Sequence, residues 1–171
     1  LLGFGPKGGA SAAAYAACDE GLDARAARIV AKAAAEGTTI GCAESLTGGL
    51  VSATLTDVPG SSAVLRGGVV SYALAVKEDV LGVDGALLAA EGAVDGSVAR
   101  QMAEGARRVL GCSIAVATTG IAGPGGAEPG KPVGTVWLAV ASEDGVRAVE
   151  RRFEGSRDEV RMASVAAAFG L

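Results

Sequence analysis

Residues 43–49, AESLTGG, place a carboxylate, two hydroxyls and two glycines directly after the apolar stretch TTIGC at 38–42. Polar residues at the carboxyl end of a strand are where an α/β protein usually meets its ligand. Ser45 is the candidate nucleophile, but a serine hydroxyl needs a base, and the usual base is histidine. The chain contains no histidine. Any catalysis by Ser45 must therefore use another base.

The isolated motif is a weak signal for a serine nucleophile. Ser45 does not lie in a GxSxG pattern, and Gly48 stands where the SxxK pattern requires lysine. The spacing alone favours a structural role in which Ser45 caps the following helix. Glu44 has a similar alternative, in which its carboxylate accepts backbone N–H groups instead of acting as an acid.

Two further stretches match the consensus patterns of phosphate-binding loops, but the residues that flank each of them do not fit the motif. GFGPKG at 3–8 matches GxGxxG, but the two residues before it cannot form the strand that the motif requires. GGAEPGK at 125–131 matches GxxxxGK, but Pro132 occupies the position of the Mg²⁺-binding hydroxyl residue, and a strand is expected next instead of a helix. The sequence does not support a nucleoside triphosphatase.

The composition bounds the partners and the compartment. The 171 residues carry a net charge of −4, with no basic run interleaved with aromatics, which argues against nucleic acid. No apolar run approaches the ~20 residues of a membrane span. The three cysteines, Cys18, Cys42 and Cys112, form no CxxC pair, so we expect small buried side chains in a reduced, cytoplasmic protein, with neither a disulfide nor a metal site.

The hydrophobic pattern predicts a single α/β domain, a mixed β-sheet flanked by α-helices in three α/β/α layers. Residues 1–22 read as a Gly/Ala-rich leader and 23–171 as the domain. The expected helices are 23–36 (capped by Asp23), 48–58, 75–81, 95–110 (with Val98, Met102, Ala106 and Val109 on its apolar stripe) and one that Ser156 and Glu159 begin with a capping box. The expected strands are 38–42, 63–74, 113–120 and a hairpin of 133–142 with 146–155.

Five blocks in order carry a resemblance that no single motif carries. They are AESLTGG, PGSS at 59–62, RGGVVSYALAVK at 66–77, TTGIAGPGG at 118–126 and KPVGTVWLA at 131–139. Together they resemble the CinA C-terminal domain family, the nicotinamide-nucleotide amidases. The resemblance covers roughly residues 23–171 and implies hydrolysis of the carboxamide of nicotinamide mononucleotide to nicotinate mononucleotide and ammonia, without metal or cofactor.

The resemblance also implies roles for particular residues. Ser45 falls on the family's nucleophile, Lys77 on its base and Tyr72 on its assisting tyrosine. A lysine serves as a base if burial or a neighbouring cation lowers its pKa. The N–H groups of Leu46 and Thr47 are the expected oxyanion donors, and Gly48 and Gly49 would let the substrate approach the backbone. Residues expected on the opposite wall, against ribose or phosphate, are Thr119, Gly120 and Gly123.

Other readings stay open. Tyr72 could be a strand residue that covers the core, and Arg66 and Lys131 are more often solvated loop cations than phosphate ligands. The chain could be a catalytically silent nucleotide-binding domain of the same fold, or an amidase for another carboxamide. A homo-oligomer is compatible with the sequence.

Overall fold

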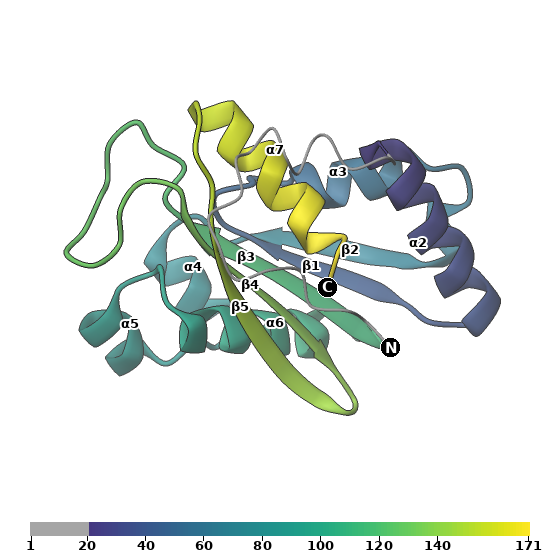
Figure 1. The fold of residues 1–171 in the computed structure, drawn as a ribbon. Helices are drawn as coiled ribbons and strands as arrows, with labels where there is room; N and C mark the ends of the chain where they lie inside the picture. The colour runs from purple at the N-terminus through teal and green to yellow at the C-terminus, as the bar shows by residue number, and fades with distance from the viewer. Residues whose placement is uncertain (1–20) are drawn as a thin grey trace.

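The computed structural model describes residues 21–171 as a five-stranded sheet covered by helices on both faces (Figure 1). In chain order the elements are α2 (Leu22–Glu36), β1 (Ile40–Glu44), α3 (Leu50–Thr56), the 3₁₀ turn η1 (Ser61–Ala63), β2 (Leu65–Val70), α4 (Leu74–Asp79), α5 (Gly85–Glu91), α6 (Gly96–Leu110), β3 (Ile114–Gly120), β4 (Thr135–Ser142), β5 (Gly145–Arg152) and α7 (Arg157–Ala168). The expected α/β class is confirmed. The GxGxxG-like stretch at 3–8, Cys18 and most of the expected leader lie outside the described residues.

The sheet has the order β2-β1-β3-β4-β5, with β2, β1 and β3 parallel and the β4–β5 hairpin antiparallel. Glu44 at the end of β1 pairs in register with Val70 of β2 and Thr118 of β3. The carboxyl ends of the three parallel strands therefore meet at one edge of the sheet. The residues that follow β1 and β2 are placed side by side there.

Two apolar clusters hold the layers together. On one face α2, α3 and α7 pack on the sheet around Val51, Leu138 and Val160. On the other face α4, α5 and α6 pack around Leu81 and Met102. Alternate residues of one strand supply both clusters, because successive side chains point to opposite faces. The described structure thus has the three layers that the sequence predicts.

Most expected elements are present, with shifted ends. The helix predicted from 23 begins at Leu22, and Asp23 is not its cap, because the cap position is Gly21 and no side chain bonds there. The strand predicted at 38–42 runs from Ile40 to Glu44, since pairing with both neighbours extends it through the glutamate. The strand predicted at 63–74 is shortened to Leu65–Val70, because the turn η1 precedes it and α4 begins at Leu74.

In the helices on either side of the sheet, one predicted cap is confirmed and one predicted buried residue is wrong. Ser156 and Glu159 form the predicted capping box of α7. In α6, Val98, Met102 and Ala106 are buried as predicted, but Val109 is 47% exposed. Leu110 packs against the cluster in that last turn instead. Cys42 and Cys112 are buried and free, as predicted.

Candidate active site

Ser45 lies in a tight turn that joins β1 to α3. The N–H of Gly48 donates to the carbonyl of Ser45 at 3.1 Å, which closes the turn. Gly48 and Gly49 have φ angles of 62° and 102°, in the left-handed region that favours glycine. The two glycines therefore serve to reverse the chain between strand and helix. Ser45 itself remains 8% exposed.

Lys77 reaches Ser45 from α4, and this contact defines the site. Its Nζ donates to Ser45 Oγ at 3.1 Å and also to the carbonyl of Ser71. The side chain is fully buried, and burial lowers the pKa of Lys77 from 10.5 to about 8. A lysine held against a serine hydroxyl, with a pKa near neutrality, has the properties of a general base.

Glu44 is a structural carboxylate, the alternative that the sequence left open. One oxygen accepts the N–H groups of Gly49 and Val51 at 2.9 and 3.0 Å, and the other accepts the N–H and hydroxyl of Ser52 at 2.8 and 2.7 Å. Glu44 therefore satisfies the first amides of α3. The structure places no cap hydrogen bond from Ser45 on this helix, so the capping reading of Ser45 is wrong.

The expected oxyanion donors lie in the same turn. Within residues 21–171, the N–H groups of Leu46 and Thr47 make no hydrogen bond. Leu46 lines the pocket beside Ser45, whereas Thr47 is fully buried and does not line it. The side chain of Thr47 points elsewhere, since its hydroxyl shares a 2.8 Å hydrogen bond with that of Thr118. Only the backbone of Thr47 is therefore a candidate for contact with substrate.

A pocket of about 230 Å³ opens beside Ser45. The residues that line it are Ser45, Leu46, Tyr72, Gly120, Ile121, Ala122, Gly123, Gly125, Gly126 and Arg157. Two of the residues expected on the far wall, Gly120 and Gly123, are among them. The third, Thr119, is fully buried, and its hydroxyl donates to the carbonyl of Ala93 at 2.7 Å. Thr119 is thus directed away from the pocket.

Tyr72 lines the pocket but does not cover the core, because its side chain is 63% exposed. In the described part of the chain, its hydroxyl has one partner, Arg157, at 3.3 Å. Only the carbonyl of Tyr72 contacts Lys77, at 3.4 Å. The structure brings Tyr72 to the site without joining its phenol to Ser45 or Lys77, and its catalytic role stays a prediction.

Arg157 is the residue of this pocket that the sequence did not reveal. It donates to the carbonyl of Gly123 at 2.8 Å as well as to Tyr72. Of the described residues that line the pocket, only Arg157 is charged. Its position follows from how α7 packs on the sheet, which no local pattern reports. Lys131, by contrast, bonds the carbonyl of Glu91 and pairs with Glu128 outside the pocket.

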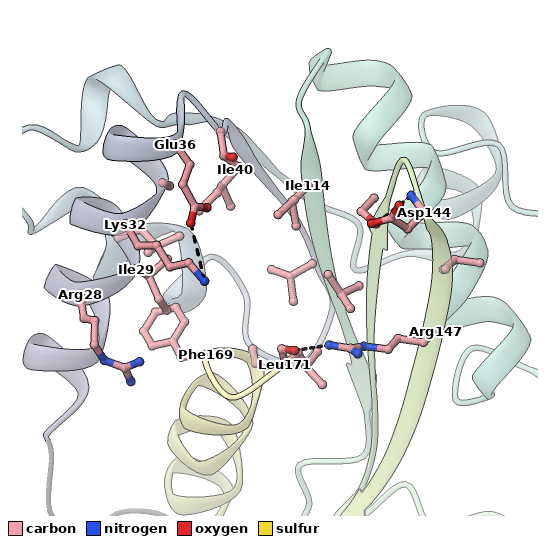
Figure 2. Close-up of a pocket in the computed structure, with 18 of the residues that line it drawn as sticks. Arg28, Ile29, Lys32, Glu36, Ile40, Ile114, Asp144, Arg147, Phe169 and Leu171 are labelled. Atoms are coloured by element: carbon pink, nitrogen blue, oxygen red, sulfur yellow. Dashed lines mark hydrogen bonds and ion pairs between the residues drawn. The ribbon is translucent and has the colours of Figure 1, made fainter. Parts of the chain in front are cut away.

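A larger hollow of about 610 Å³ lies at the opposite end of the parallel strands (Figure 2). It is lined by Ile40 and Ile114, the first residues of β1 and β3. Lys32 pairs with Glu36 at 3.9 Å on one side of this hollow, and Arg147 donates to the carbonyl of Leu171 on the other. No serine–lysine contact occurs among the residues that line it. The chemistry therefore points to the smaller pocket.

Two negative findings concern the described residues only. No described helix is long and apolar enough to cross a membrane. Nor do three or more His, Cys, Asp or Glu side chains of residues 21–171 gather where they could hold a metal ion.

Comparisons with known proteins agree on one family. The CinA C-terminal domain family matches residues 22–171. The CinA-like protein of Anaeromyxobacter dehalogenans strain 2CP-C is 54% identical over 152 residues, which cover 89% of this chain and 37% of that protein. The CinA-like protein of Geobacter sulfurreducens is 48% identical over 150 residues, 88% of this chain and 36% of that protein. The chain thus spans little more than a third of the length of these curated relatives.

Solved structures share the fold. The competence/damage inducible protein CihA of Agrobacterium tumefaciens is 43% identical, with a TM-score of 0.84 over 86% of this chain and 91% of that one. A CinA superfamily protein of Klebsiella pneumoniae is 32% identical, with a TM-score of 0.85 over 88% of this chain and 94% of that one. On the evidence of sequence and fold together, the chain belongs to the CinA C-terminal domain family.

Proposed function

We propose that this chain hydrolyses the carboxamide of nicotinamide mononucleotide to nicotinate mononucleotide and ammonia, with Ser45 as nucleophile and Lys77 as general base. The observation that carries the proposal is the 3.1 Å contact between Lys77 Nζ and Ser45 Oγ, made by a buried lysine whose pKa falls to about 8. The family resemblance supplies the substrate, and the contact supplies a way to activate the serine without histidine.

The first half of the reaction acylates Ser45. Ser45 Oγ forms a bond to the carboxamide carbon while its proton passes to neutral Lys77 Nζ. The carbonyl π electrons move to oxygen, and the N–H groups of Leu46 and Thr47 stabilise the oxyanion. When the intermediate collapses, the C–N bond breaks, Lys77 returns the proton to the leaving nitrogen, and ammonia departs.

The second half releases the acid. A water molecule attacks the ester carbon and gives its proton to Lys77, forming a second oxyanion intermediate. Breakage of the ester bond returns that proton to Ser45 Oγ and leaves nicotinate mononucleotide. Lys77 is neutral again at the end, so each turnover consumes one amide and one water.

The pocket suits a small group better than a whole nucleotide. Its volume of about 230 Å³ lies below the range of roughly 300–1,000 Å³ typical of larger ligand sites. We place the carboxamide-bearing ring beside Ser45 and the sugar phosphate toward Arg157, whose guanidinium matches phosphate oxygens in charge and geometry. The glycines of residues 120–126 present backbone without side chains to the sugar.

Ammonia release from a matched set of carboxamides tests the proposal. Nicotinamide mononucleotide, nicotinamide riboside and free nicotinamide differ only in the phosphate and the sugar. We expect the highest kcat/KM for the mononucleotide and a lower one for the riboside, which lacks the phosphate. No ammonia from any of them would favour a silent nucleotide-binding domain. Faster release from a carboxamide without phosphate would move the substrate assignment to that class.

A further inference from the structure

Arg161 of α7 binds the backbone of the catalytic turn from outside the pocket. Its Nε donates to the carbonyl of Leu46 at 3.0 Å, and its Nη2 donates to the carbonyl of Thr47 at 3.1 Å. The side chain is 28% exposed and pairs with Asp158 at 3.6 Å. Arg161 does not line the pocket beside Ser45. Its contacts are with the turn, so a substrate in that pocket would not be its direct partner.

Each of these hydrogen bonds fixes the plane of a peptide group. In a trans peptide, the carbonyl of one residue and the N–H of the next lie in one plane and point in opposite directions. The bond from Arg161 to the carbonyl of Leu46 therefore directs the N–H of Thr47 away from Arg161. That N–H makes no hydrogen bond within residues 21–171.

The neighbouring peptide planes are held by other means. The turn hydrogen bond from Gly48 to the carbonyl of Ser45 orients the plane that carries the N–H of Leu46. The carbonyl of Thr47 also binds Arg161, but the N–H in its plane belongs to Gly48, which the turn already uses. Among the described contacts, the plane carrying the N–H of Thr47 has one side-chain anchor, Arg161.

We propose that Arg161 is a positioning residue for the oxyanion hole. Its hydrogen bond to the carbonyl of Leu46 holds the N–H of Thr47 in the direction where the reaction develops negative charge. This inference rests on the proposed amidase function. The fixed fork of a guanidinium suits the task because it binds two adjacent carbonyls at once. Preorganised donors of this kind avoid reorientation during the reaction, and that is the source of their catalytic effect.

Kinetics of Arg161→Met and Arg161→Lys, with Arg108→Met as the matched control, give the first test. Arg108 also donates to a carbonyl of another element, that of Leu81 at 2.8 Å, but on the opposite face of the sheet. Loss of one oxyanion donor costs about 10²- to 10³-fold in kcat. We expect Arg161→Met to lose roughly tenfold to 10²-fold in kcat, since a misdirected donor still samples the active orientation.

The changes in kcat and KM together distinguish a residue that positions the oxyanion donor from one that binds the substrate. KM for nicotinamide mononucleotide should change less than about twofold, and the pH midpoint of kcat should stay that of wild type, because Arg161 makes no contact with Lys77. Arg161→Lys keeps the charge without the fork, so it should recover only part of kcat. Wild-type kcat in Arg161→Met, full recovery in Arg161→Lys, or a loss confined to KM would each overturn the proposal.

A second readout needs no turnover. The residual dipolar coupling of the Thr47 N–H, measured by NMR in the free protein, should change in Arg161→Met and stay constant in Arg108→Met. An unchanged coupling in Arg161→Met would overturn the positioning role even if the enzyme proved slow. Failure of the wild type to release ammonia from any carboxamide would instead refute the amidase function, and the coupling would still decide whether Arg161 orients the peptide.

Discussion

Replacing Lys77 by arginine separates a general base from a fixed positive charge. Arginine keeps the charge and most of the reach, but its guanidinium does not deprotonate in proteins. If Lys77 takes the proton of Ser45, Lys77→Arg should lose about 10²- to 10⁴-fold in kcat, the usual contribution of general-base catalysis. Lys77→Met should lose a similar factor, because it removes the base without adding a charge.

The pKa of Lys77 determines what fraction of the wild-type enzyme carries the neutral, active base at a given pH. At a pKa of about 8, roughly 9% of Lys77 is neutral at pH 7, against roughly 0.03% for a lysine at the ordinary value of 10.5. Burial therefore raises the population of the active form about 300-fold at neutral pH. Because the base acts when deprotonated, kcat/KM should rise about tenfold from pH 6 to pH 7 and level off above pH 8.

The assay measures ammonia release from nicotinamide mononucleotide from pH 5.5 to 10, with kcat and KM fitted separately at each pH. Circular dichroism at each pH confirms that the variants stay folded. A Lys77→Arg enzyme within tenfold of wild-type kcat would refute the general-base role. A wild-type profile that still rises at pH 10 without levelling off would refute the effect of burial on the pKa of Lys77.

Three further changes test separate parts of the site. Glu44→Gln should lower the free energy of unfolding in urea by about 1–3 kcal/mol, because an amide nitrogen cannot accept the N–H groups that the carboxylate accepts. The control Glu36→Gln, which breaks an exposed ion pair, should lower it by less than about 1 kcal/mol. Equal losses in the two variants would contradict the structural role of Glu44. Arg157→Gln should raise KM for nicotinamide mononucleotide and leave KM for nicotinamide riboside nearly unchanged, whereas a parallel rise would argue against a phosphate contact. Dialysis against a chelator should leave kcat unchanged, and a loss restored by Zn²⁺ or Mg²⁺ would point to a different mechanism.

The sequence predicted which segments meet at the candidate site better than it predicted how their side chains point. Ser45 and Lys77 came from ordered blocks, and the parallel register of β1 and β2 brings their segments together as the prediction requires. Thr119 was expected at the wall, but strand alternation turns it toward Ala93 in the segment between α5 and α6 and leaves Thr118 facing the turn. The two-residue period of a strand shows that adjacent side chains point to opposite faces of the sheet, but it does not show which of them faces the site.

Residues of α7 were beyond sequence reasoning for a different reason. Arg161 reaches the turn across 115 positions of the chain, and Arg157 reaches Tyr72 across 85. Such contacts depend on where the helix packs over the sheet, which the capping box of Ser156 and Glu159 does not determine. The sequence left open whether Glu44 acts as an acid or accepts backbone N–H groups. Its position at the end of β1 directs the carboxylate to the first amides of α3, which favours the second role.

Ammonia release from nicotinamide mononucleotide by Ser45→Ala, relative to wild type, tests the central claim most directly. Because Ser45 does not cap α3, the variant should keep the wild-type melting temperature and bind the substrate normally. We predict that it releases no ammonia above the uncatalysed background. A folded Ser45→Ala enzyme that retains more than about a few per cent of wild-type kcat would contradict nucleophilic catalysis by Ser45.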